Sequence, residues 1–126
     1  MISVKIPRDA AETQAHIIAS SEAEITDLEV VNVKSLKESP RALRLIDAVF
    51  SLEEGMTAFL WWEDASGESL ILPLEGRGRL DLSPVGGIHN PRNEGWTGHV
   101  KLTTSHKTPG RKKSFFIGLE FSKVRE

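Results

Sequence analysis

Residues 61–104 have the sequence WWEDASGESLILPLEGRGRLDLSPVGGIHNPRNEGWTGHVKLTT, and this stretch decides the fold. A tryptophan pair precedes leucines at alternate positions, a loop rich in glycine and proline, and a second alternating segment. A period of two is typical of half-buried β-strands, and glycine, proline, asparagine and aspartate mark the turns between them. The stretch therefore predicts a β-rich scaffold that carries one long loop, residues 83–98.

Apolar alternation continues on both sides of this stretch. Pro7 is expected to end a first strand at a sheet edge. Residues 9–19 are ambiguous. Asp9 and Glu12 fit the capping box of a helix, but residues 16–19 fit a strand, and the strand is favoured. Strands are expected at residues 2–6, 9–19, 28–36, 43–52, 57–62, 70–74, 80–82, 100–104 and 115–121.

Spacing between turn signals predicts an all-β fold, a single-domain antiparallel β-sandwich or small barrel over residues 1–126. The Glu-Glu-Gly at residues 53–55 is expected to close a hairpin that pairs strands 43–52 and 57–62. In strand 43–52 the expected inward row is Ile46, Ala48, Phe50 and Leu52, and Leu45 is expected on the opposite side. The other expected inward rows are Leu70, Leu72 and Leu74 and, at the centre of the core, Phe115, Ile117, Leu119 and Phe121.

The adjacent tryptophans indicate a strand with two apolar faces. Trp61 shares its face with Phe59, whereas Trp62 shares its face with Ala58 and Leu60. Either the strand is buried between two layers, or one tryptophan is exposed to a partner. The second alternative makes Trp62 a candidate contact residue, and an exposed tryptophan would also suit a carbohydrate-binding module.

Composition indicates a folded, non-membrane domain. The chain has 126 residues, of which 39% are hydrophobic, and it has no cysteine, which excludes disulfides, thiolate zinc sites and cysteine nucleophiles. No signal peptide or membrane-length apolar segment is evident, so a soluble, unexported chain is expected. The net charge of −2 argues against a protein that grips nucleic acid over its whole surface.

Charge is segregated along the chain. Residues 9–68 hold thirteen acids and four bases, a net charge of −9, whereas residues 99–126 hold seven bases and two acids, a net charge of +5. If the fold keeps these segments on separate faces, complementary faces favour docking on a partner or on copies of the same chain. Two solvated surfaces without a partner are the alternative.

Metal and catalytic motifs are not evident. The four histidines lack the spacing of metal ligands, and His99 is expected to share a solvent-facing side with Lys101. Acidic residues at strand positions could serve glycosidase chemistry if two of them faced each other across a cleft, but pairing of Asp47 or Asp81 with Arg77 or Arg79 is favoured. Neither catalysis, a metal nor another cofactor is therefore expected.

A basic cluster occupies the turn before the last strand. Lys107, Arg111, Lys112 and Lys113 could contact nucleic acid or an acidic protein surface. Interleaved aromatic residues, which stack on bases, are missing, so a charged hairpin tip that prevents aggregation is favoured over a nucleic-acid site.

The order of landmarks over residues 42–122 resembles small virion structural proteins of tailed, marine bacteriophages. The resemblance rests on Trp61-Trp62, Leu72-Pro73-Leu74, Gly76 and Gly78, Leu80-Asp81-Leu82, Gly86-Gly87-Ile88, Asn90-Pro91 and the segment 95–104, GWTGHVKLTT. The group often has aspartate at the position of His99, and the turn 108–113 is unusually basic here. Both departures concern surface contacts rather than the fold.

The resemblance implies a non-enzymatic capsid cement or decoration protein on the virion surface, assembled in the host cytoplasm. Its expected partners are the major capsid protein and copies of itself, as a trimer or dimer, without membrane or nucleic acid. A head–tail connector or minor tail subunit is the alternative within the virion, and a carbohydrate-binding module is the alternative of another class. The candidate partner-binding residues are Trp62, Ile88, His89, Asn90, Arg92, Trp96, Arg111, Lys112 and Lys113.

Overall fold

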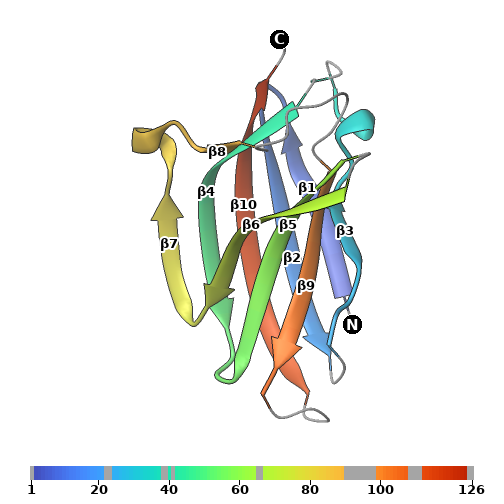
Figure 1. Cartoon of the computed structure of the whole chain (residues 1–126), viewed down its shortest axis with the longest axis vertical. Helices are drawn as coiled ribbons and strands as arrows, with labels where there is room; N and C mark the ends of the chain where they lie inside the picture. The colour runs from blue at the N-terminus through green and yellow to red at the C-terminus, as the bar shows by residue number, and fades with distance from the viewer. Residues whose placement is uncertain are drawn as a thin grey trace.

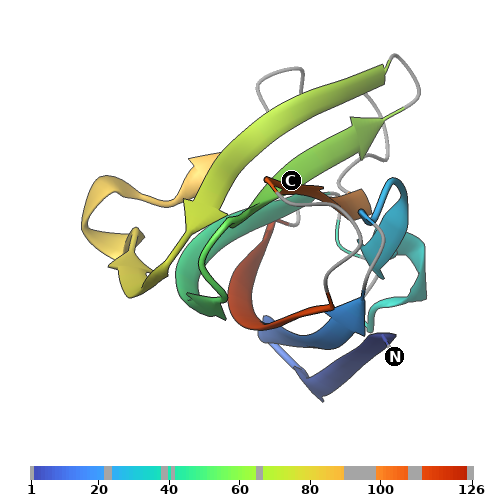
Figure 2. The same cartoon turned by 90° about the horizontal axis from the view of Figure 1, so that it is seen from below.

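The computed structural model describes residues 2–21, 24–37, 40, 42–64, 67–89, 99–107 and 112–124. Within these residues the chain forms ten β-strands and two 3₁₀ turns, which build two layers (Figures 1 and 2). The strands are β1 (Ile2–Asp9), β2 (Glu12–Ser21), β3 (Leu28–Val31), β4 (Ala42–Leu52), β5 (Met56–Asp64), β6 (Gly67–Glu75), β7 (Arg77–Asp81), β8 (Ile88–His89), β9 (His99–His106) and β10 (Lys113–Val124), and the 3₁₀ turns are η1 (Val33–Ser35) and η2 (Ser83–Val85).

The two layers are antiparallel sheets. Sheet A has the order β1-β2-β10-β4-β7, with β8 paired to β4, and sheet B has the order β3-β9-β5-β6. Figure 2 shows sheet A curving beneath β5, β6 and β9 of sheet B. The predicted all-β sandwich is therefore confirmed.

The core lies between β10 of sheet A and β5 of sheet B. Phe115, Ile117, Leu119 and Phe121 are buried, as the alternation predicts, and β10 has a paired neighbour on each side. The Phe121 ring meets Trp62 of the opposite sheet edge to face, with 6.2 Å between ring centroids. Burial of these large side chains supplies the main stabilising free energy of such a fold.

Two predicted hairpins are wrong. The strands that flank the basic cluster, β9 and β10, do not pair with each other, because β9 pairs with β3 and β5 whereas β10 pairs with β2 and β4. Strands β4 and β5 do not form a hairpin, because β4 pairs with β10, β7 and β8 whereas β5 pairs with β6 and β9. Gly55, with a φ of 89°, turns the chain from one sheet to the other, and its carbonyl accepts a hydrogen bond from Lys107 N–H. Strands β4 and β9 therefore end, and strands β5 and β10 begin, at the same end of the sandwich (Figure 1).

Two bulges correct the predicted inward rows. On β4 the register shifts between Asp47 and Leu45, so Leu43 and Leu45 are buried together with Ala48, Phe50 and Leu52, while Ile46 lies at the shift. On β6 the register shifts beside Leu70, which is exposed, and Ile71 is buried in its place. A bulge adds one residue to one strand and thereby reverses which positions face the core.

The N-terminal half shows two smaller differences. Strand β1 lies at the sheet edge as predicted but continues beyond Pro7 through a register shift, which an edge strand tolerates. Strand β3 ends at Val31 instead of extending to residue 36. The Asn32 side chain accepts a hydrogen bond from Lys34 N–H and starts the turn η1. The ambiguous segment is a strand, β2, as favoured.

Candidate functional site

The predicted contact residues do not gather into one site. Asn90, Arg92, Trp96 and Arg111 lie outside the described residues. Trp62 is only 1% exposed, so its assignment as a partner contact is wrong. The inward face of β5 carries it into the core beside Phe121.

The remaining candidates divide between the two ends of the sandwich. Ile88 and His89 form β8 beside Arg44, at the start of β4, and His89 is exposed. Lys112 is exposed and Lys113 is half-buried at the start of β10, which pairs with the end of β4. Eight residues of β4 separate the two places, about 25 Å at the usual rise per residue.

The outer face of sheet B carries an apolar patch that the tryptophan alternation indicated only in part. Phe59 and Trp61 are half-buried, with 6.5 Å between their ring centroids, and Pro73 and Leu70 are exposed, Leu70 to 48%. Trp61 pairs with Leu70, and Phe59 pairs with Pro73, across β5 and β6. We call these four side chains the sheet B patch.

The indole of Trp61 lies across the sheet rather than pointing straight out. Its Nε1–H donates to Oγ1 of Thr103, 3.0 Å away on β9. The direct cross-strand partner of Trp61 on β9 is Lys101, whereas Thr103, the next outward residue of β9, pairs with Phe59. The hydrogen bond therefore holds the half-buried ring diagonally over β9.

Acidic residues surround the sheet B patch. Lys101, beside Trp61, is held between Glu63 Oε2 at 2.5 Å and Asp27 Oδ1 at 2.9 Å. The hydrogen bonds that Lys101 donates to Glu63 and Asp27, and then the charges of these carboxylates, raise the pKa of Lys101 above its usual range. The further acids on this face are Glu29 on β3 and Glu68 and Glu75 on β6.

The outer face of sheet A carries a second apolar patch, which the sequence did not predict. Phe116 is half-buried beside Ile18, its cross-strand partner on β2, and Val49 of β4 pairs with Gly118, the next outward position of β10; both aliphatic side chains are exposed. The Phe116 ring lies over Gly118, where a Cβ would come within 3.2 Å of its Cζ. The His16 ring meets Phe116 edge to face at 5.7 Å. We call Ile18, Phe116 and Val49 the sheet A patch.

The turn η2 presents the most exposed apolar side chain among those described. Val85 is 77% exposed, at the gold turn on the left of Figure 1. Asp81 holds the start of η2, because its Oδ1 accepts hydrogen bonds from Ser83 Oγ at 2.7 Å and from Ser83 N–H at 3.2 Å. These bonds lower the pKa of Asp81.

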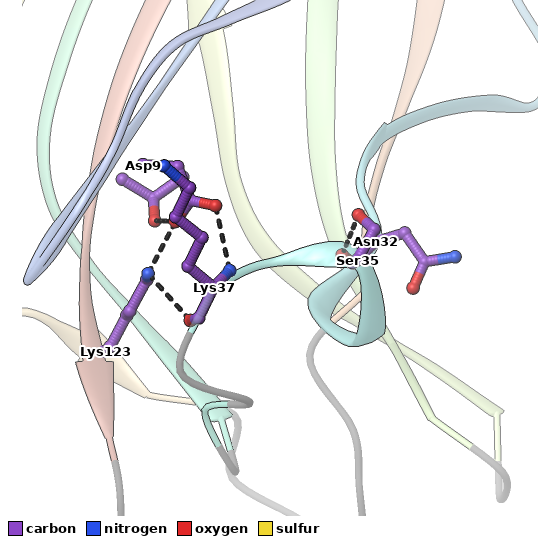
Figure 3. Close-up of polar contacts among 6 residues, drawn as sticks. Asp9, Asn32, Ser35, Lys37 and Lys123 are labelled. Carbon is purple, nitrogen blue, oxygen red and sulfur yellow. Dashed lines mark hydrogen bonds and ion pairs between the residues drawn. The ribbon is translucent and has the colours of Figure 1, made fainter.

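A partly buried ion pair joins Lys123 of β10 to Asp9 of β1, next to the segment that follows η1 (Figure 3). Lys123 Nζ lies 2.5 Å from Asp9 Oδ1 and donates to the carbonyl of Lys37 at 3.0 Å. Asp9 Oδ2 accepts from Lys37 N–H at 2.8 Å. Burial acts to raise the pKa of Asp9, but the bonds from Lys123 and Lys37 and their charges outweigh it and leave the pKa lowered. This pair ties β1, β10 and the segment after η1 together.

Arg79, His99 and His106 make contacts that fit a structural role. Arg79 makes a two-point contact with Asp47, at 2.9 and 3.2 Å, one of the pairings that the sequence favours. His99 Nδ1 accepts from Val33 N–H, and His106 Nε2 lies 3.2 Å from Thr104 Oγ1 in a buried position. Among the described residues, no three or more histidines and carboxylates gather closely enough to hold a metal ion. A helix of membrane-spanning length and hydropathy is likewise not found in the described part of the chain.

Comparisons with known proteins give no family. No protein-family model and no curated protein matches the chain. Among solved structures, the crystal structure of protein SO0799 from Shewanella oneidensis is similar, with 13% sequence identity and a TM-score of 0.34. The match covers 95% of this chain and 60% of that protein. These comparisons therefore assign no function, and the surfaces of the sandwich are the basis for inferring one.

Proposed function

We propose that this chain is a structural subunit of a tailed-phage virion, a capsid cement or decoration protein that binds the assembled shell of the major capsid protein. The observation that carries the proposal is the presence of exposed apolar side chains on both outer faces of the sandwich and on η2. Contiguous exposed apolar surface on a folded domain marks a site of interaction. The resemblance of residues 42–122 to phage virion proteins supplies the class of assembly.

The turn η2 and the adjacent β8 are the contact that we assign to the shell. Val85 projects from a turn that Asp81 and the backbone of residues 82–87 hold in place, since Gly87 N–H donates to Leu82 O at 2.8 Å. Ile88 and exposed His89 continue this surface. An apolar anchor on a fixed turn loses little conformational entropy on binding, which favours affinity.

Stabilisation of the shell would follow from mass action. A subunit that binds the assembled shell and not its dissociated parts lowers the free energy of the assembled state by RT ln(1 + [L]/Kd) at each site. No chemical step is required. The free energies of many equivalent sites add over one shell, so a modest affinity suffices.

The proposal is tested by mixing the purified chain with expanded shells of the phage that encodes it. We expect saturable binding in co-sedimentation and a higher temperature of shell disruption. The variant Val85→Asp should lose binding, whereas the control Ile6→Asp, which also introduces a charge at an exposed apolar site, should retain it. Absence of binding, together with full heat and osmotic resistance of virions that lack the chain, would exclude a cement function. Location of the chain at the neck or tail of the virion would favour the connector or minor tail subunit.

A carbohydrate-binding module on the virion is the second candidate. One observation favours it: half-buried Trp61 and Phe59 lie side by side on the outward face of sheet B, and Trp61 is held by its hydrogen bond to Thr103. Aromatic rings in this position stack on apolar faces of ligands. Tight binding on a glycan array that Trp61→Ala abolishes would support this candidate, and an array without any such binding would reject it.

A further inference from the structure

The two outer faces of the sandwich differ in the charge that borders their apolar patches. We infer that copies of this chain assemble head to tail, with the sheet A patch of one copy packed on the sheet B patch of the next. The inference rests on the proposal that the chain is a structural subunit, and it identifies the surface that joins the subunits to each other.

The sheet B patch lies inside a ring of acids. Glu29 is outward and exposed at one edge of the sheet, on β3, and Glu75 is outward and exposed at the other edge, on β6. Glu63 and Glu68 are cross-strand neighbours on β5 and β6, in the next outward row after Trp61 and Leu70. The cation in the ring, Lys101, already has carboxylate partners in Glu63 and Asp27. This face therefore has an excess of negative charge.

Cations border the sheet A patch at both edges. Lys5 is exposed on β1 and pairs with His16, which contacts Phe116. Arg77 is exposed on β7 and pairs with Ser51, the neighbour of Phe116 on β4. The acids of this sheet face, including Asp47 and Glu120, begin one outward row further along the strands, beyond Val49. The half of the face that carries the patch is therefore positive at its edges.

The distance between the two acids on sheet B is similar to the distance between the two cations on sheet A. From Glu29 to Glu75 there are three steps between neighbouring strands and an offset of four residues along the strand direction. From Lys5 to Arg77 there are four steps between strands and an offset of two residues. With strands about 4.8 Å apart and residues rising about 3.4 Å, both separations come to about 20 Å. One copy can therefore contact both acids of its neighbour at once, while Phe116 rests against Trp61 and Phe59.

A symmetric contact through the sheet B patch alone is disfavoured, because it would place one ring of acids against another. The contact between different faces is heterologous, so repetition generates a closed ring or an open filament. A closed ring of three copies agrees with the trimer that the resemblance implies as an alternative to a dimer. It would also present several copies of η2 to the shell together, which multiplies their combined affinity.

Four forms of the full-length chain test this inference by sedimentation analysis at about 50 mM salt, where long-range screening is weak. We expect the wild type to be a discrete oligomer. The variants Glu29→Lys/Glu75→Lys and Lys5→Glu/Arg77→Glu should each be monomeric, because each makes the two faces alike in sign. The quadruple variant, which reverses both faces, should recover the wild-type mass. The two double variants mixed in equal amounts should associate with each other into assemblies of even copy number, because the two kinds must alternate. The single reversals Lys34→Glu and Glu53→Lys, at exposed positions on η1 and the β4–β5 turn, serve as controls and should leave the mass unchanged.

Thermal unfolding of every form separates loss of assembly from loss of fold. A monomeric wild type at all concentrations would overturn the inference, as would double variants with unaltered mass or a quadruple variant that stays monomeric while folded. None of these results would bear on the binding of Val85 to shells, which is measured separately. The failure of self-assembly and the failure of shell binding are therefore distinguishable.

Discussion

Lys123 and Asp9, 114 positions apart in the sequence, form a partly buried ion pair with 2.5 Å between Nζ and Oδ1. Lys123 occupies the inward row that continues from Leu119 and Phe121, and its side chain is 1% exposed. The ammonium also donates to Lys37 O. The last strand is thus connected to the first strand of sheet A and to the segment after η1, at the end of the sandwich that carries β8.

Removal of the Asp9 carboxylate should destabilise the fold. The variant Asp9→Asn replaces the carboxylate by a neutral amide and leaves the buried ammonium of Lys123 without its counter-ion, so we expect unfolding in urea to require about 3 kcal/mol less free energy. Further replacement by Lys123→Met should recover part of this loss, because no charge is then left buried. A loss below about 0.5 kcal/mol for Asp9→Asn would contradict the proposed importance of the pair.

The same pair predicts the acid dependence of stability. Because the pKa of Asp9 in the folded state lies below its ordinary value of 3.8, its contribution is fully present above that value and is lost as the pH falls through the folded-state pKa. The difference in unfolding free energy between wild type and Asp9→Asn should therefore be constant near neutral pH and decrease below about pH 4. A difference that decreases already between pH 7 and 5 would require another group.

Two adjacent glycines should respond differently to alanine. Gly86 and Gly87 both have positive φ, 83° and 81°, but a Cβ on Gly87 would lie 2.6 Å from Arg44 Cγ and 2.8 Å from the carbonyl of Leu45, whereas a Cβ on Gly86 meets nothing within 4 Å. We expect Gly86→Ala to cost about 1 kcal/mol of backbone strain and Gly87→Ala at least twice as much. Equal melting temperatures for the two variants would mean that β8 is not packed on β4 as described.

The tryptophan pair offers a matched test of which face of β5 is inside. Trp62→Ala removes a fully buried ring and should cost about 3–5 kcal/mol of unfolding free energy. Trp61→Ala removes a half-buried ring and its hydrogen bond to Thr103, for which about 1 kcal/mol is expected from the bond together with a smaller loss of packing. Chemical denaturation of both variants measures the order, and a larger loss for Trp61→Ala would reverse the assigned faces.

Simple alternation was sufficient to predict β10 and the presence of a two-layer β fold, because strict period-two patterning occurs only where one face is buried. Alternation could not locate the bulges beside Leu45 and Leu70, since one added residue is invisible in a sequence pattern but reverses the inward side. It also could not foresee that Lys123 fills a core position, because a charge in an apolar row normally marks the surface. The sheet A patch was missed because Ile18, Phe116 and Val49 come from three separate strands and gather only through the register of β2, β10 and β4.

The candidate contact residues were harder to predict than the fold. The prediction for Trp62 follows from a strand with two apolar faces, for which alternation alone does not tell which face is inside; the structure buries the face of Ala58, Leu60 and Trp62. Val85 was overlooked inside the loop 83–98, although a branched apolar residue between Pro84 and Gly86 is an unusual choice for a solvated turn. Its exposure became evident only from the geometry of η2.

Binding to the capsid shell is the most direct test of the proposed cement function. Purified chain is added at increasing concentration to expanded shells that lack it, and bound protein and the temperature of shell disruption are measured together. We expect binding to saturate at a fixed number of copies per shell and the disruption temperature to rise with occupancy. Both effects should be lost in Val85→Asp. Shells that bind no chain, or that bind it without any rise in disruption temperature, would contradict the assignment as a capsid cement protein.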